Sequence, residues 1–249
     1  MERLLSGQRE EPLSLKLVRE GGSPQVVTLH KSFLLWGAPY KKSVSEPRPD
    51  KIARLADGIF YVDLCRVTSG EFDAAAGDLA EATGIVFDVR GYPPPTDLNL
   101  DFLGHLVDEP IVSAHCLTPV IESPENQRQR YLWQHSVIEP KLPRLTAKTA
   151  FMLDARAISY AESLLQMVEH YKLGELVGQP TAGCNGALVF LNLPCGYVLT
   201  WTGMRVLKHD GSHVQGVGVI PTIAVAPTIA GIKGGRDEAL ERAVAEVSG

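Results

Sequence analysis

The chain has 249 residues, of which 45% are hydrophobic and 21% charged, and its formal net charge is −5. This balance is typical of a globular protein with one large domain, or with one domain and a fragment of another. The negative charge and the lack of a Lys/Arg cluster argue against nucleic-acid binding. No apolar run reaches the roughly 18 residues of a membrane span. Residues 1–14 lack the apolar core of an export signal, so we expect no leader in this chain.

The four cysteines are scattered along the chain and form no C-x-x-C pair (Cys65, Cys116, Cys184 and Cys195). Their spacing fits neither a zinc site nor a disulfide framework. We therefore expect no metal and no cofactor, and we expect chelators to leave any activity unchanged. The cellular compartment stays undecided.

Two alternating apolar patterns, at residues 13–18 and 25–29, flank a Gly/Pro turn and predict a β-hairpin. A lone two-stranded hairpin is marginally stable in water, so we expect it to be the remnant of a larger module. A polar, proline-containing stretch over 41–50 predicts a linker. The predicted organisation is therefore an N-terminal part, 1–50, and a main domain, 51–249.

Strand and helix signals alternate from residue 51 onward. Strands are expected at 59–64, 84–89, 111–114, 150–153 and 176–177, and helices at 68–83, 97–107, from 159, and at 237–247. The segment 118–147 is expected to be a loop, and 186–206 to be rich in β-structure. This alternation predicts an α/β fold with a layered core around a mainly parallel sheet.

Ser159 stands where an apolar strand gives way to a helix, and two interpretations of it are open. The free N–H groups and positive dipole at a helix N-terminus favour a developing anion, as an acyl-transfer nucleophile requires. However, Ser159-Tyr160-Ala161-Glu162 is also S-x-x-E, the pattern of a capping box. The residues around the serine do not decide between these roles.

Six segments, in this order, resemble the catalytic domain of the tail-specific, or C-terminal-processing, serine peptidases, which include the tricorn-like peptidases. They are FDVRG (87–91), MLDARAISYAES (152–163), GQPTAGCNG (178–186), LPCGY (193–197), TGMRVLKHDGS (202–212) and GVGVIPT (216–222). The resemblance covers residues 55–225 and implies a crotonase-like or Clp-protease-like layered fold. The N-terminal hairpin resembles the end of a PDZ module.

The resemblance implies an acyl-enzyme mechanism with Ser159 as the nucleophile. The main-chain N–H groups of Tyr160 and Gly91 would then form the oxyanion hole. Cys184 stands where one branch of the family carries the lysine of a Ser/Lys dyad, and we interpret it as a packing residue. The tricorn-like branch uses a histidine from an N-terminal lobe, absent here, and a glutamate where this chain has Gln215. Gln215 could orient a histidine but could not stabilise its charge.

Other polar residues are expected to have structural roles. His209 and His213 lie in a predicted solvated turn, and His170 is three helical turns from Ser159. His105, His115 and His135 are expected at the surface or in packing. Asp88 and Arg90 are expected to form a buried pair. Met152, Met167 and the region of Trp201 are expected in the core.

The leading hypothesis is a serine-type peptidase acting on a polypeptide, with weak or no activity in this chain alone because the lobe that carries the base is missing. A homo-oligomer would be one source of the missing parts. The alternatives are a non-catalytic polypeptide-binding scaffold and a crotonase-like acyl-thioester enzyme. Relatives are often exported to the cell envelope, but the localisation of this chain is not predicted.

Overall fold

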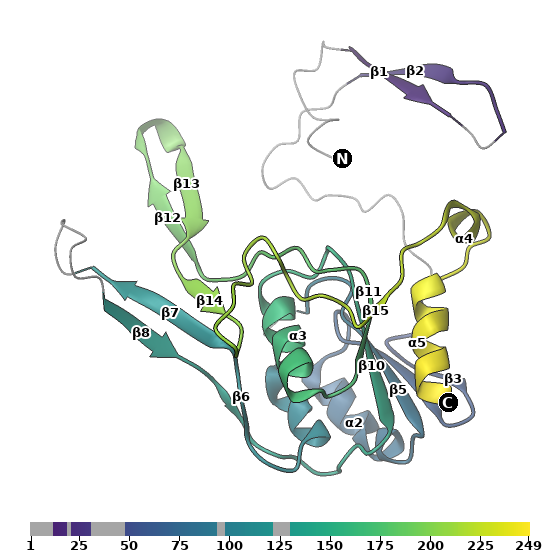
Figure 1. Cartoon of the computed structure of the whole chain (residues 1–249), viewed down its shortest axis with the longest axis vertical. Coiled ribbons are helices and arrows are strands. Elements are labelled where there is room, and N and C mark those ends of the chain that lie inside the picture. Colours follow the sequence, from purple (N-terminus) through teal and green to yellow (C-terminus); the bar gives the residue numbers. More distant parts are fainter. Residues whose placement is uncertain (1–11, 19–20, 31–47, 94–97, 122–129) are drawn as a thin grey trace. The chain divides into compact units, whose positions relative to one another are not determined.

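The computed structural model describes residues 12–18, 21–30, 48–93, 98–121 and 130–249, and the chain divides into two compact units, Met1–Pro47 and Arg48–Gly249 (Figure 1). In the first unit, β1 (Pro12–Leu17) pairs in antiparallel fashion with β2 (Gln25–His30). The predicted N-terminal hairpin is therefore confirmed. Most of the predicted linker, 41–47, lies outside the described residues.

A six-stranded sheet forms the centre of the second unit. Its strands are β3 (Ile52–Ala56), β4 (Ile59–Asp63), β5 (Gly84–Asp88), β10 (Lys148–Leu153), β11 (Glu175–Gly178) and β15 (Ile223–Ala224), in the spatial order β15-β11-β10-β5-β4-β3. All neighbours are parallel except β3 and β4. The prediction of a mainly parallel α/β sheet is confirmed. β5 is buried along its whole length, as its continuous apolar sequence predicts.

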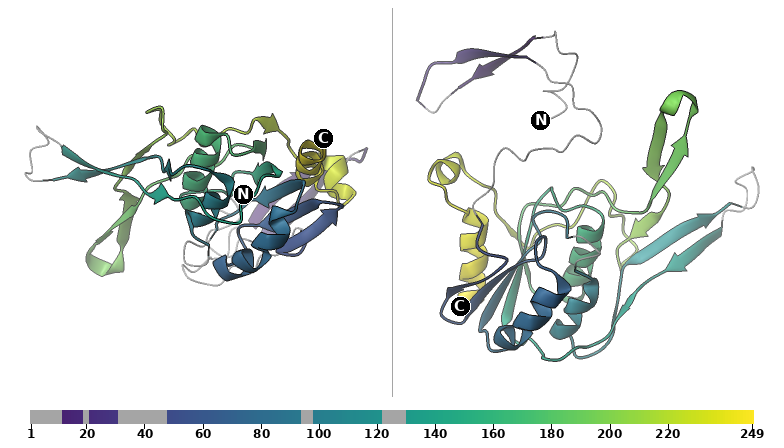
Figure 2. Two further views of the ribbon diagram at one scale, coloured as in Figure 1. Left: turned by 90° about the horizontal axis from the view of Figure 1, so that it is seen from below. Right: turned by 180° about the vertical axis from the view of Figure 1, so that it is seen from behind.

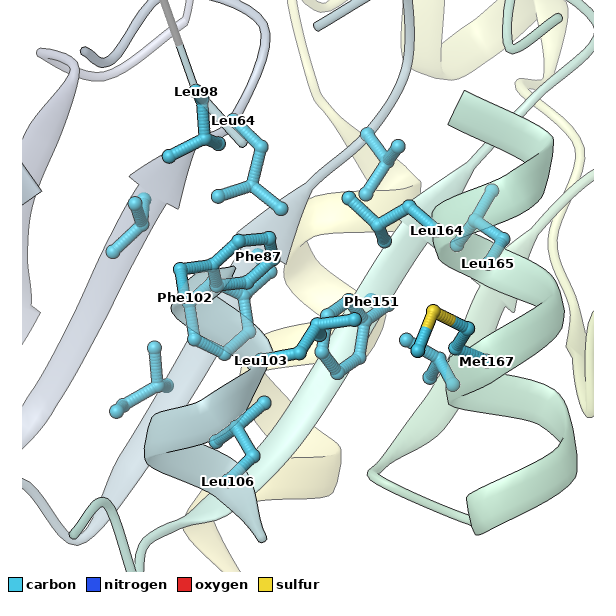
Figure 3. Close-up of a cluster of buried hydrophobic side chains, with 14 of the residues drawn as sticks. Leu64, Phe87, Leu98, Phe102, Leu103, Leu106, Phe151, Leu164, Leu165 and Met167 are labelled. Carbon is cyan, nitrogen blue, oxygen red and sulfur yellow. The ribbon is translucent and has the colours of Figure 1, made fainter. Parts of the chain in front are cut away.

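Helices cover both faces of this sheet and make three layers (Figure 2). On one face lie α2 (Ser69–Ala80), α3 (Tyr160–Tyr171) and the 3₁₀ helix η1 (Leu100–Leu106). The larger hydrophobic cluster fills this side, with the rings of Phe87 and Phe151 stacked at 4.8 Å (Figure 3). On the other face, α5 (Glu238–Ser248) packs Ala243 and Val247 against Val86 and Met152, after the short α4 (Ile229–Lys233). None of the described helices has the length and apolar character of a membrane span.

The remaining strands lie outside the central sheet. They are β6 (Ile111–Val112) with β9 (Val137–Ile138), β7 (His115–Val120) between β8 (Arg130–Gln134) and β14 (Arg205–Leu207), and the hairpin of β12 (Leu188–Asn192) and β13 (Val198–Thr202), whose turn holds η3 (Pro194–Gly196). The prediction of a loop over 118–147 is wrong where β8 and β9 form. The prediction that Trp201 lies in the core is also wrong, since it is 44% exposed on a hairpin that projects from the layers (Figure 1).

Candidate active site

Ser159 occupies the sharp turn between β10 and α3, and its backbone is strained. Its dihedral angles are φ 52° and ψ −112°, a region that residues with a Cβ rarely adopt. A serine on a strained strand-to-helix turn is the arrangement that presents a nucleophile above a parallel sheet. Such strain persists only where the surrounding structure imposes it. The contacts of this turn are therefore central to the site.

The loop 181–186 holds the serine turn in place through the main chain. The N–H of Ser159 donates to the carbonyl of Cys184 at 2.8 Å, and the N–H of Ala182 donates to the carbonyl of Ala157 at 3.2 Å. These two hydrogen bonds join both ends of the turn to the loop. The Ser159 N–H is therefore not available to an oxyanion.

Glu162 is the residue that fixes this loop, so the capping-box interpretation is wrong. The Ser159 side chain makes no capping hydrogen bond, and Glu162 is completely buried. Its carboxylate accepts hydrogen bonds from Thr181 Oγ1 at 2.6 Å and from the N–H groups of Gly183 and Cys184 at 2.7 and 2.9 Å. Within the described part of the chain, the Ser159 hydroxyl has no hydrogen-bond partner. No described base therefore lies within hydrogen-bond reach of it.

Tyr160 places a main-chain donor next to the serine. It is the first residue of α3, and no acceptor among the described residues takes its N–H, which lies at the positive end of the helix. The Tyr160 hydroxyl points elsewhere and donates to the carbonyl of Leu98 at 3.1 Å. Burial raises the pKa of this phenol to about 12, so the side chain stays neutral. The Tyr160 N–H is thus an unpaired main-chain donor next to the serine.

The main-chain N–H of Gly91, the second predicted donor, is occupied in this structure. It donates to the carbonyl of Val89 at 2.8 Å. Gly91 has φ +152°, and a Cβ there would lie 3.1 Å from Cys65 Sγ, so the position favours glycine. Burial, with the charges of Asp63 and Asp88, raises the pKa of Cys65 to about 12, which keeps its thiol neutral. The second donor of an oxyanion hole is therefore not preformed.

The predicted buried pair of Asp88 and Arg90 is confirmed and is part of a larger network. Arg90 Nη2 lies 2.7 Å from Asp88 Oδ2 and 2.7 Å from Asp237 Oδ2. The hydroxyl of Tyr61 also donates to Asp88 at 2.8 Å. Burial on its own would raise the pKa of Asp88, but Arg90 and Arg48 outweigh it and hold that pKa below its usual range. The network anchors the end of β5 to the start of α5.

Gln215 also holds the same loop. Its Nε2 donates to the carbonyl of Asn185 at 2.9 Å, and Asn185 Nδ2 donates to Ser163 Oγ at 3.1 Å. The described contacts of Gln215 include no histidine. Cys184 is exposed, so its predicted role as a packing residue is wrong. Its contribution to the site is the carbonyl that binds Ser159.

Three histidines gather at the other end of α3, a cluster that no sequence motif indicated. The rings of His170 and His209 are stacked at 4.0 Å, and His115 lies 6.3 Å from His209. His209 lies in a turn, as predicted, but it is half-buried and bonds the carbonyl of Val112 at 2.8 Å, so the prediction that this turn is solvated is wrong for His209. Eleven residues of helix separate His170 from Ser159, about 16 Å at 1.5 Å per residue. This cluster therefore does not reach the serine.

The other two informative histidines have different surroundings. His213 is exposed, and its Nε2 lies 3.1 Å from Arg205 Nη2. His105 is buried and its Nδ1 lies 2.8 Å from the carbonyl of Pro143, which confirms a packing role. Among the described residues, no group of three or more His, Cys, Asp or Glu side chains is arranged to hold a metal ion. His213 is the histidine nearest in sequence to Gln215.

The layered parallel sheet and the serine on its strained turn are features of the serine-peptidase class of α/β domains. Comparison with known families agrees, since residues 104–225 match the model of peptidase family S41. This part of the chain is therefore similar to the peptidases of that family. Ser159, Cys184 and Gln215 lie inside the matched region, whereas β5 and Gly91 precede it.

Solved structures with the same fold are distant in sequence. A protein of Parabacteroides merdae ATCC 43184 assigned as a peptidase has 22% identity and a TM-score of 0.67, over 80% of this chain and 64% of its own. Mature CPAF has 13% identity and a TM-score of 0.63, over 89% and 64%. The photosystem II D1 C-terminal processing protease has 15% identity and a TM-score of 0.50, over 90% and 57%.

The chain thus spans less than two thirds of the length of each of these three proteins. No curated protein sequence matches it. At these identities the likeness establishes the fold, and the tail-specific family resemblance of the sequence agrees with it.

Proposed function

We propose that this chain is the catalytic part of a serine-type peptidase and that Ser159 is its nucleophile. The observation that carries the proposal is the strained turn that leaves the Ser159 hydroxyl free beside the unpaired N–H of Tyr160. The hydroxyl would attack the scissile carbonyl of a polypeptide and transfer its proton to a base. The departing amine would take up that proton, and water would then release the acyl group from the serine.

Stabilisation of the tetrahedral oxyanion is assigned to the main chain. The Tyr160 N–H is positioned for this role by the helix that starts there. Gly91 would join it only when its N–H leaves the carbonyl of Val89, which requires rotation of one peptide unit. The role proposed for Gln215 is to brace the loop that holds Ser159, rather than to act on substrate.

The general base would come from one of two sources. Cys184, at the position of the dyad lysine, offers a thiol in place of an amine. His213 is two residues from Gln215 and is the first candidate within the described residues. A base supplied by another part of a longer protein, or by another copy, is the second source. We further propose the PDZ-like assignment of residues 1–50 and a homo-oligomeric state.

Labelling with a fluorophosphonate tests the nucleophile directly. We expect mass spectrometry of the labelled chain to find one adduct on Ser159 and none in Ser159→Ala. If His213 is the base, His213→Ala slows labelling by at least about 100-fold, the lower range for general-base catalysis. His135→Ala, at another exposed histidine, is the matched control and leaves the rate unchanged. A folded chain that takes no adduct contradicts the proposal for this chain alone.

One observation favours a second function, a non-catalytic polypeptide-binding scaffold. The Gly91 N–H is already bonded to Val89, and Pro93, two residues on, has no N–H to replace it. This function predicts no adduct on Ser159 but saturable binding of an unfolded polypeptide, measured by fluorescence anisotropy. Binding that is equal in wild type and Ser159→Ala, without labelling, would identify the scaffold.

A further inference from the structure

The β12–β13 hairpin exposes an unusually large apolar surface. Every residue of both strands is exposed, on both faces of the ribbon. The largest exposures belong to Tyr197 at 72%, Phe190 at 63% and Leu188 at 57%. Figure 1 shows the ribbon standing away from the three layers. Nothing in the described part of this unit covers it.

The size of this surface is that of an interface. Its nine large apolar residues are each between 38% and 72% exposed, whereas monomeric proteins rarely expose contiguous apolar patches larger than a few hundred Å². Stable protein interfaces bury about 800 Å² per partner. The nine residues are Leu188, Val189, Phe190, Leu191, Leu193, Tyr197, Val198, Leu199 and Trp201. Such an exposed apolar surface marks a site of interaction with another molecule.

The outer edge of β12 is open and lacks the features that protect an edge strand. β12 and β13 form a two-stranded sheet, and residues 187–203 contain no charged side chain. Natural edge strands commonly carry lysine or proline to prevent pairing with another chain. β12, of sequence LVFLN, carries neither. Because it has no charged side chains, the hairpin cannot form ion pairs with a charged partner. Its apolar side chains and open strand edge are complementary to those of a second copy.

The hydrogen bonds within the hairpin fix the register of such a pairing. The bonds from Gly203 N–H to Ala187 and from Leu193 N–H to Tyr197 show which β12 residues bond to β13. Because antiparallel bonding alternates, the outward groups are those of Leu188, Phe190 and Asn192. These three positions are symmetric about Phe190. A second β12, antiparallel and related by a two-fold axis, would pair Phe190 with Phe190 of the copy.

We propose that this chain forms a homodimer in which the β12 strands of two copies pair about a two-fold axis through Phe190. The two hairpins join into one four-stranded sheet, in which apolar side chains of the two β12 strands pack beside one another on each face. An isologous contact of this kind needs only one self-complementary patch. This proposal does not depend on the peptidase activity.

Sedimentation velocity over a range of concentrations tests the dimer. We expect wild type to reach twice 27.1 kDa. Phe190→Lys and Phe190→Glu each place like charges opposite one another and weaken the dimer at least about tenfold in Kd. An equimolar mixture of the two variants restores a dimer, because opposite charges then meet. Ile232→Lys is the matched control, since Ile232 in α4 is 66% exposed, and it leaves Kd unchanged.

Hydrogen exchange of wild type gives an independent measurement that needs no variant. Protection of the amides of Leu188, Phe190 and Asn192 should rise with protein concentration. The proposal is overturned if wild type stays monomeric, if Phe190→Lys dimerises like wild type, or if the charge-swapped mixture stays monomeric. Binding of monomeric wild type to lipid vesicles or to an extended peptide through this hairpin would overturn it in favour of that occupant.

Discussion

The carboxylate of Glu162 lies 2.9 Å from the main-chain nitrogen of Cys184, although 22 residues separate them in sequence. Glu162 is on the first turn of α3, and the carbonyl of Cys184 in turn accepts the N–H of Ser159. One buried acid therefore determines the position of the loop that holds the serine turn. The reactivity of Ser159 should depend on a residue that does not touch substrate.

Replacement of Glu162 by glutamine should destabilise the chain and slow the labelling of Ser159. An amide has one accepting oxygen, so its NH₂ group would face a buried N–H donor. We expect the free energy of unfolding to fall by about 2 kcal/mol, the usual cost of an unsatisfied buried hydrogen-bonding group. Urea unfolding and fluorophosphonate labelling measure the two effects. Glu169→Gln, at a partly exposed ion pair on the same helix, should cost less than about 1 kcal/mol.

Replacement of Ser159 by glycine should make the chain more stable than replacement by alanine. Glycine adopts φ 52° and ψ −112° without steric cost, whereas alanine retains the strain. We expect a difference of about 1–3 kcal/mol in the free energy of unfolding, the usual range for such strain. The same two substitutions at Lys172, which has φ 53° at the end of α3, are the control. Glycine should be more stable than alanine there too. Equal stability of the two Ser159 variants would show that the turn is not strained in solution.

Two substitutions of Asp237 should separate its two roles. Its side chain caps α5 by accepting the N–H of Leu240 at 3.0 Å, and it pairs with Arg90 at 2.7 Å. Asp237→Asn keeps the cap and loses the charge, which should cost about 1 kcal/mol at this largely buried position. Asp237→Ala loses both and should cost about 2 kcal/mol. Urea midpoints measure both, and equal losses would mean that the cap contributes nothing.

The histidine cluster should make stability depend on pH near neutrality. Burial, together with the charges of His170 and His115, lowers the pKa of His209 below its ordinary value of about 6.5. The unfolded chain therefore binds a proton first as the pH falls, so stability decreases below about pH 6.5 until the folded-state pKa is passed. Glu169 and Lys208, paired at 2.9 Å, also adjoin the cluster.

His209→Gln should reduce this pH dependence. Glutamine can donate to the carbonyl of Val112 but does not titrate. Urea midpoints between pH 7.5 and 5.5 should vary less in the variant than in wild type. His135→Gln, an exposed control, should vary like wild type. A variant with the full wild-type pH dependence would exclude His209 as its source.

Two similar motifs show what local sequence can and cannot decide. Thr68-x-x-Glu71 and Ser159-x-x-Glu162 both match a capping box, and only the first forms one. Glu71 is exposed, and its carboxylate accepts the Thr68 N–H while it also pairs with Lys51 Nζ at 2.7 Å. Glu162 faces the interior, where three donors from the loop 181–186 take its oxygens. Those donors are distant in sequence, so the motif alone could not identify them.

The strands of the central sheet were predictable because burial on both faces leaves a continuous apolar sequence, as in β5. The strands of the projecting hairpin were also predictable from their β-branched and aromatic residues. The error at Trp201 has a different cause. An apolar strand has the same sequence pattern whether its own domain or another molecule covers it. The secondary structure around Trp201 was therefore predictable, but its exposure was not.

The hairpin starts at Leu188, three residues after Asn185 and four after the residue whose carbonyl holds the Ser159 turn. The loop 181–186 is therefore attached at three places: to α3, to Gln215 and to the first strand of the β12–β13 hairpin. Ordering of the ribbon would therefore act on the loop whose carbonyl accepts the Ser159 N–H. Dimerisation through the hairpin would then be coupled to the position of Ser159. In a monomer, the loop that holds the serine turn would be less firmly held at its hairpin end.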